Sequence, residues 1–309
     1  MSEKTDLLKK KRNVNHHENP NFWNSALALR GSITPKVIKN VFLCILYSLV
    51  VSFVCHYFPN LKLPISPFEY AGVVMGLSLV FRVNAGYDRW WEARKIWGDI
   101  VNSIRNLSIL VISYTHDTDD LKKEDTLGLI TALPILIKNH LRSIINTEET
   151  KSYLSHQDYV DLQNTSHKPN FIGLRIAEQL SFMCENKLIS PFAFLKAEEL
   201  RQALINSLGA CERILKTPIP IVMAIKVRRF IFLFLLVLPF ALTDSVLIDT
   251  MVTGLVAYAL LSLDQIGLEL QNPFSIENLS HLPLNDICNT IKKDIAELAN
   301  QSKKLDCSE

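Results

Sequence analysis

The sequence predicts an all-α membrane protein with four transmembrane helices in two hairpins and a large cytosolic helical region. Apolar segments occur in two pairs, a polar stretch with helical periodicity separates the pairs, and no alternating strand pattern of useful length is present. The expected parts are a cytosolic N-terminal arm at 1–25, a first transmembrane hairpin at 26–82, a cytosolic helical region at 83–227, a second transmembrane hairpin at 228–264 and a cytosolic C-terminal tail at 265–309.

The composition supports a membrane protein and argues against a nucleic-acid partner. Hydrophobic residues make up 48% of the 309 residues and charged residues 21%, below the roughly 25% of soluble domains. The net charge of +2 gives no basic field that would attract nucleic acid. The six cysteines form no CxxC pair, so we expect reduced thiols and neither a disulfide framework nor a zinc site. No signal peptide is apparent, because a polar arm precedes the first apolar run.

The first hairpin contains one strong span and one weaker span. The segment from Asn40 to Leu61 lacks Asp, Glu, Lys and Arg and exceeds the about 20 residues that a bilayer crossing needs. A buried core helix is the alternative for this segment. The second span, from Ala71 to Phe81, is also apolar, and we expect nearby prolines to break it: Pro59, Pro64 and Pro67.

The region between the hairpins is predicted to be helical. An apolar stripe at three- and four-residue spacing indicates a helix. Its members are Phe194, Leu200, Leu204, Leu208, Cys211 and Leu215. The segment from Leu127 to Ile137 is short and apolar, so we expect a buried helix that Pro134 interrupts.

The second hairpin has two uncharged arms, Phe230 to Thr243 and Thr250 to Leu263, with a turn between Asp244 and Asp249. A further helix is expected from Leu284 to Leu298 in the polar tail. Basic residues lie beside the start of the first span, the end of the second and the start of the third, whereas the short loop within each hairpin lacks a basic cluster. The positive-inside rule therefore places both termini and the 83–227 region in the cytoplasm.

The residues that could carry chemistry do not predict an enzyme. No two histidines lie at HxxxH spacing, no ExxH pair occurs, and neither GxGxxG nor a GxxxxGK phosphate loop is present. We therefore expect no catalytic residue, no cofactor and no metal site.

Two segments could instead line an ion pathway. On a helix, Val73, Leu77 and Phe81 form one narrow apolar line beside Gly72 and Gly76. This line has two interpretations: a lipid-facing or core surface, or a hydrophobic constriction in a ring of helices.

The second such segment runs from Thr217 to Ile221, where two prolines at alternate positions break a helix and expose Ile219. The alternative interpretation of this segment is a simple helix terminus before the next span.

Three acidic residues, Glu69, Asp244 and Asp249, form an acidic outer mouth or are solvated turn residues. In the segment from Tyr87 to Trp91, paired Trp beside Asp and Arg suits a membrane-interface anchor, or a cation–π or ion-pair role within the fold.

Five segments together resemble the bestrophin family, in its prokaryotic branch, over about residues 25 to 300. They are Arg30 to Ile33, Phe81 to Gly98, Thr217 to Pro220, Asn272 to Phe274 and Leu282 to Cys288. The resemblance implies a homopentamer around one central pore in a multi-pass membrane protein of the bacterial inner (plasma) membrane. It also implies that Val73, Leu77 and Phe81 form a hydrophobic neck and that Ile219 forms a cytosolic aperture.

The expected function is passive conduction of small monovalent ions, either chloride and other anions or sodium and potassium. Animal and plant members resemble anion channels, whereas the acidic outer residues of this chain lean towards cations. The calcium-binding acids of animal members are reduced here to Glu277, so no calcium site is expected. The alternatives are a secondary transporter and a membrane scaffold protein.

Overall fold

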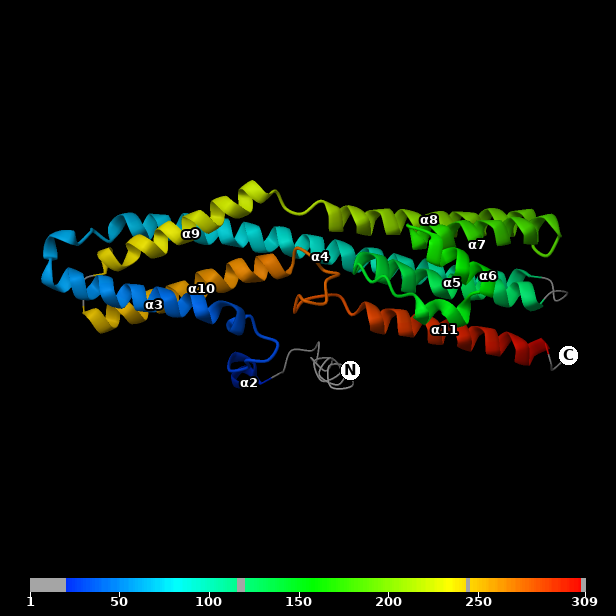
Figure 1. Ribbon diagram of the computed structural model, residues 1–309, viewed down its shortest axis with the longest axis horizontal. Coiled ribbons are helices and arrows are strands. Elements are labelled where there is room, and N and C mark those ends of the chain that lie inside the picture. The colour runs from blue at the N-terminus through cyan, green and yellow to red at the C-terminus, as the bar shows by residue number, and fades with distance from the viewer. Residues whose placement is uncertain (1–20, 116–119, 243–244, 307–309) are drawn as a thin grey trace. The chain divides into compact units, whose positions relative to one another are not determined.

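The computed structural model describes residues 21–115, 120–242 and 245–306, and all regular structure among them is helical (Figure 1). The all-helical prediction is therefore confirmed for these residues. The helices are, in chain order, α2 (Phe22–Ala26), α3 (Thr34–Tyr57), the 3-10 helix η1 (Pro59–Leu61), α4 (Ser66–Tyr114), α5 (Asp120–Leu141), the 3-10 helix η2 (Glu148–Tyr153), α6 (His156–Asn164), α7 (Lys168–Glu185), α8 (Pro191–Lys216), α9 (Ile221–Ala241), α10 (Val246–Glu269) and α11 (Leu284–Asp306).

The chain divides into two compact units. The first unit comprises 1–87 and 219–271, and the second comprises 88–218 and 272–309. The long helix α4 contributes to both, so the boundary that the sequence suggested at 82/83 falls inside a continuous helix.

The first unit is built from α3, the beginning of α4, α9 and α10. Helices α3 and α10 pack side by side (Figure 1). A Cβ atom added at Gly254 would lie 2.9 Å from Ile45 Cγ1, so glycine is needed for the approach of these two helices. By length and composition, α3 and α10 are each able to cross a membrane. Helix α9 is apolar beyond its opening turns, which carry Lys226, Arg228 and Arg229.

The helix α4 corrects our expectation of a span broken by prolines. Pro59 lies in η1, Pro64 precedes α4, and Pro67 lies in the first helical turn, where the missing N–H would have no intrahelical partner. The helix therefore runs without interruption to Tyr114. Its inner face packs Met75 and Leu79 against α9 and α10.

The second unit contains one continuous hydrophobic core. Trp97 on α4 is fully buried, and the cluster around it contains further residues of α4, residues of α5, α6, α7, α8 and α11, and residues of connecting segments. The predicted stripe on α8 is confirmed, since Leu204, Leu208 and Cys211 are buried. The expected buried helix is also present as α5, but Pro134 lies inside it and does not interrupt it.

Several predicted boundaries agree with the structure. Helix α8 ends at Lys216 and α9 begins at Ile221, so the paired prolines do separate two helices. Helix α11 begins at Leu284, as predicted, and continues past Leu298. The five described cysteines are unpaired thiols, and Cys307 lies outside the described residues.

Candidate functional site

The predicted neck residues lie along the outer face of α4. Val73, Leu77 and Phe81 are 65%, 56% and 64% exposed, whereas Met75 and Leu79 on the opposite face are at most 1% exposed. The three side chains therefore have little contact with the rest of their own chain. Such an apolar line must be covered by lipid, by another chain or by the lumen of a pore.

Gly76 lies on the same part of α4 and is not required by packing within the chain. A Cβ atom at this position would meet nothing within 4 Å. Glycine inside a helix costs roughly 0.5–1 kcal/mol relative to alanine. Its presence on an open face therefore fits a close approach by a helix of another chain.

The predicted aperture residue Ile219 lies in the bend between α8 and α9 and is half-buried. The end of α8 is held in place by Arg89, which donates a hydrogen bond to the Thr217 carbonyl (2.6 Å) and another to the Ile214 carbonyl. Trp90 Nε1 donates to the Ser280 carbonyl (2.6 Å). The aromatic and basic segment after the second span thus has structural contacts within the second unit.

The three acidic residues of the expected outer mouth differ in their surroundings. Glu69 is exposed in the first turn of α4. Asp249 is only 5% exposed inside the first turn of α10, so it is not the solvated turn residue that the sequence suggested. Asp244 lies outside the described residues.

A buried ionic cluster in the first unit was missed by the sequence reasoning. Arg82, which is 2% exposed, lies with Nη2 3.1 Å from Asp264 Oδ1 and donates from Nη1 to the Ala224 carbonyl (3.2 Å). Arg228 Nε donates to Asp264 Oδ2 (2.9 Å). Lys36 forms a second pair with the buried Glu269. Charged residues within otherwise apolar helices were the available signal, because such residues are normally paired or functional.

Close helix contacts surround this cluster. A Cβ atom at Gly267 would lie 3.2 Å from Arg82 Cγ, and one at Gly86 would lie 3.0 Å from Leu270 Cβ. Small residues therefore let α4 and α10 approach closely enough for Arg82 to reach Asp264.

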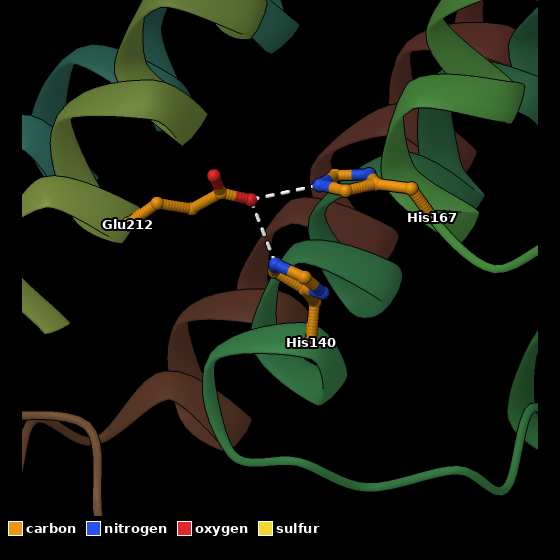
Figure 2. Close-up of side chains that lie close together, drawn as sticks. All are labelled: His140, His167 and Glu212. Atoms are coloured by element: carbon orange, nitrogen blue, oxygen red, sulfur yellow. Dashed lines mark hydrogen bonds and ion pairs between the residues drawn. The ribbon is translucent and has the colours of Figure 1, made fainter. Parts of the chain in front are cut away.

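The second unit holds a convergent group of metal-ligating side chains that sequence spacing did not suggest. His140, His167 and Glu212 come from different helices and point towards one another (Figure 2). They are far apart in the sequence, so no short motif could reveal them. Two thiols of this unit are poor ligands by comparison, because burial raises the pKa of Cys211 to about 12 and that of Cys288 to about 11.

The family of the chain follows from its similarity to known proteins. Residues 13–297 match the family model described as Bacterial/Fungal Bestrophin protein. The chain belongs to the bestrophin family. The predicted resemblance is thereby confirmed over most of the chain, and a membrane protein is the established class.

Related bestrophins carry names that describe ion conduction. A protein of Nostoc sp. named voltage-dependent anion channel-forming protein is 34% identical over 91% of this chain and 92% of its own length. A protein of Escherichia coli K12 with the same descriptive name is 31% identical over 88% of this chain and 90% of its own length.

Solved structures show the same fold. A bacterial bestrophin homologue from Klebsiella pneumoniae, crystallised as a point mutant, superposes with a TM-score of 0.80 at 26% identity. The superposition covers 87% of this chain and 98% of that one.

Proposed function

We propose that this bestrophin is an ion channel that conducts small monovalent ions passively through a homopentameric pore. The observation that carries this proposal is the family match over residues 13–297. The names of the curated relatives favour anions as the permeant ions. The exposed apolar line on α4 and the open position of Gly76 are consistent with a helix that faces an axis or another chain.

In this proposal Val73, Leu77 and Phe81 form the hydrophobic neck. A ring of apolar side chains repels water when the pore is narrow, so it acts as a gate by dewetting. We assign Ile219 to the second, cytosolic aperture, and its half-buried aliphatic side chain in the bend between α8 and α9 supports this assignment. Neither constriction carries a charge, so selectivity for ion sign would arise elsewhere along the pathway.

The proposed topology has both termini in the cytoplasm. The hairpins at 26–82 and 228–264 cross the bilayer, and the regions at 1–25, 83–227 and 265–309 are cytosolic. Basic residues at the start of α9 and near the start of α3 support this orientation. The bacterial inner membrane is the proposed location.

Exposure and spacing alone do not distinguish a pore from a lipid-facing surface, and α3 supplies a matched control. Phe42, Leu46 and Val50 have the same three residue types at the same spacing and are 64%, 50% and 56% exposed. Replacing Val73, Leu77 and Phe81 together by Ala should raise conductance or open probability in planar bilayers. Replacing the three α3 residues by Ala should leave the single-channel current unchanged.

The decisive first measurement is the reversal potential of the purified protein under an asymmetric potassium chloride gradient. A reversal near the chloride equilibrium potential supports an anion channel, and one near the potassium equilibrium potential supports a cation channel. No current from a correctly assembled pentamer removes the channel proposal and favours the scaffold or the transporter. An unchanged current in the α4 triple variant removes the neck assignment.

A secondary transporter is the second candidate, and the buried pair of Arg82 and Asp264, which the half-exposed Arg228 joins, is the observation that favours it. Ionisable residues within a membrane segment are frequent in substrate and proton pathways. A transporter would give a slow flux that saturates with substrate concentration, whereas a channel gives discrete single-channel currents.

A further inference from the structure

Three side chains of the second unit converge on one point. His140 lies in the last turn of α5, His167 caps the N-terminus of α7, and Glu212 lies on α8 (Figure 2). The Nε2 atoms of His140 and His167 lie 2.7 Å and 2.8 Å from the same oxygen, Glu212 Oε1. All three potential ligand atoms lie within 4.8 Å of one another.

The scaffold around this cluster is rigid on one side and open on the other. Helices α5, α7 and α8 pack against one another through the buried core of the second unit. The side chains of His140, His167 and Glu212 remain 27%, 32% and 19% exposed. An ion could therefore enter from solvent, and a water molecule could occupy a further coordination position.

The charges suit a cation. Glu212 brings an acidic side chain to the point where the two imidazoles meet, with Oε1 within hydrogen-bond distance of both Nε2 atoms. Lys216 lies on the other carboxylate oxygen, with Nζ 3.4 Å from Oε2, and leaves Oε1 to the two imidazoles.

We propose that His140, His167 and Glu212 bind a divalent transition-metal ion, with Zn²⁺ as the best match. Two imidazole nitrogens and one carboxylate oxygen are a common three-ligand set for zinc, and water completes the tetrahedron. Calcium and magnesium prefer sites made of oxygen ligands, so they fit this cluster poorly. The bound ion would cross-link α5, α7 and α8. This site does not depend on the conduction proposal.

Metal binding requires small adjustments of the cluster. Ligand atoms of a tetrahedral zinc ion lie about 3.4 Å apart, so the ion would replace the two hydrogen bonds and separate the nitrogens slightly from Oε1. His167 Nδ1 accepts a 3.3 Å hydrogen bond from the Asn170 backbone N–H, which assigns the proton to Nε2. Ligation through Nε2 would move that proton to Nδ1 and replace this long, weak contact.

The test measures zinc bound to the untagged full-length protein in detergent, after chelator treatment and dialysis against Zn²⁺. The wild type should retain about one zinc ion per chain, and Co²⁺ should give the d–d absorption of a tetrahedral site. Glu212→Gln keeps the shape and one acceptor oxygen for the histidines but removes the anionic ligand. This variant should weaken zinc affinity by more than the roughly 10–100-fold that loss of an outer-shell partner causes.

Two further variants complete the design. His140→Ala should reduce zinc binding as strongly as Glu212→Gln, and zinc should raise the thermal unfolding midpoint of the wild type but of neither variant. His156→Ala changes an exposed histidine outside the cluster and should bind zinc like the wild type. The proposal is overturned if the wild type binds no zinc, or if folded Glu212→Gln protein binds as much zinc as the wild type. The cluster is then a pair of histidines hydrogen-bonded to a carboxylate.

Discussion

The two units of the chain bury their apolar residues to very different extents. The second unit closes one large core around Trp97, with contributions from five further helices. The first unit buries a smaller cluster around Met75 and Leu79 and leaves large apolar side chains exposed on α3, α4, α9 and α10. A single chain thus completes the core of the second unit, whereas the first unit leaves large apolar surfaces uncovered by its own chain.

The units also use charge differently. In the first unit, Arg82 and Asp264 form an ion pair that is almost entirely removed from solvent. In the second unit, a typical pair such as Arg105 with Asp294 has side chains that are 43% and 30% exposed. The same residue types should therefore contribute very unequally to stability in the two units.

The sharpest test of this difference compares Arg82→Ala with Arg105→Ala. Removal of Arg82 leaves Asp264 buried with Arg228 alone, and loss of a buried partner costs about 3–5 kcal/mol. Loss of the exposed Arg105 pair should cost about 0–1 kcal/mol. Thermal unfolding midpoints in detergent give both values. Equal midpoints for the two variants would show that the Arg82 cluster is hydrated in the protein.

Core truncation provides the next largest effect. Leu133 on α5 is fully buried in the second unit, and Leu133→Ala should lower the free energy of unfolding by about 2–5 kcal/mol. Leu77→Ala removes the same atoms from a side chain that is 56% exposed and should change stability by about 0.5 kcal/mol or less. A large loss of thermal stability in Leu77→Ala would indicate that this residue packs against another chain and does not face a pore.

The sequence predicted those elements whose signals are local. The paired prolines at 218 and 220 end one helix and delay the next, and the spacing of Leu204, Leu208 and Cys211 identifies the buried face of α8. The uninterrupted course of α4 was not predicted, because Pro67 lies in the first turn of the helix, where proline is tolerated.

Contacts between distant segments were beyond the reach of sequence patterns. His140 and Glu212 meet only because α5 and α8 pack together, and Arg82 reaches Asp264 only because Gly267 lets α4 approach α10. The assignment of Val73, Leu77 and Phe81 to a neck is a proposal that comes from the family resemblance. Their spacing and exposure are shared by residues on α3, so these properties alone could not have identified them.

The smallest predicted effect is a pH-dependent one in the second unit. Glu149 Oε2 accepts a hydrogen bond from Lys138 Nζ (2.9 Å), and Oε1 accepts one from Lys292 Nζ (2.6 Å). Burial raises the pKa of Glu149, but the two lysines outweigh burial and hold this pKa below its usual value. Because the pKa is lowered by folding, the stabilisation is present above the unfolded pKa of about 4.3 and is lost as the pH falls through the lower folded pKa.

Glu149→Gln should therefore destabilise the protein by about 1 kcal/mol at pH 7, since the Glu149 side chain is 42% exposed and solvent screens the pair. The difference from the wild type should shrink as the pH falls below the unfolded pKa of about 4.3. It should vanish once the pH is below the lower folded pKa, where Glu149 of the folded wild type also becomes neutral. Unfolding midpoints between pH 7 and 3 provide the measurement. Glu199→Gln is the matched control, because its pair with Lys196 is 65% exposed on both sides and should show no such convergence. A constant difference at all pH values would mean that Glu149 stabilises the second unit by packing, as its apolar core does, and not by its charge.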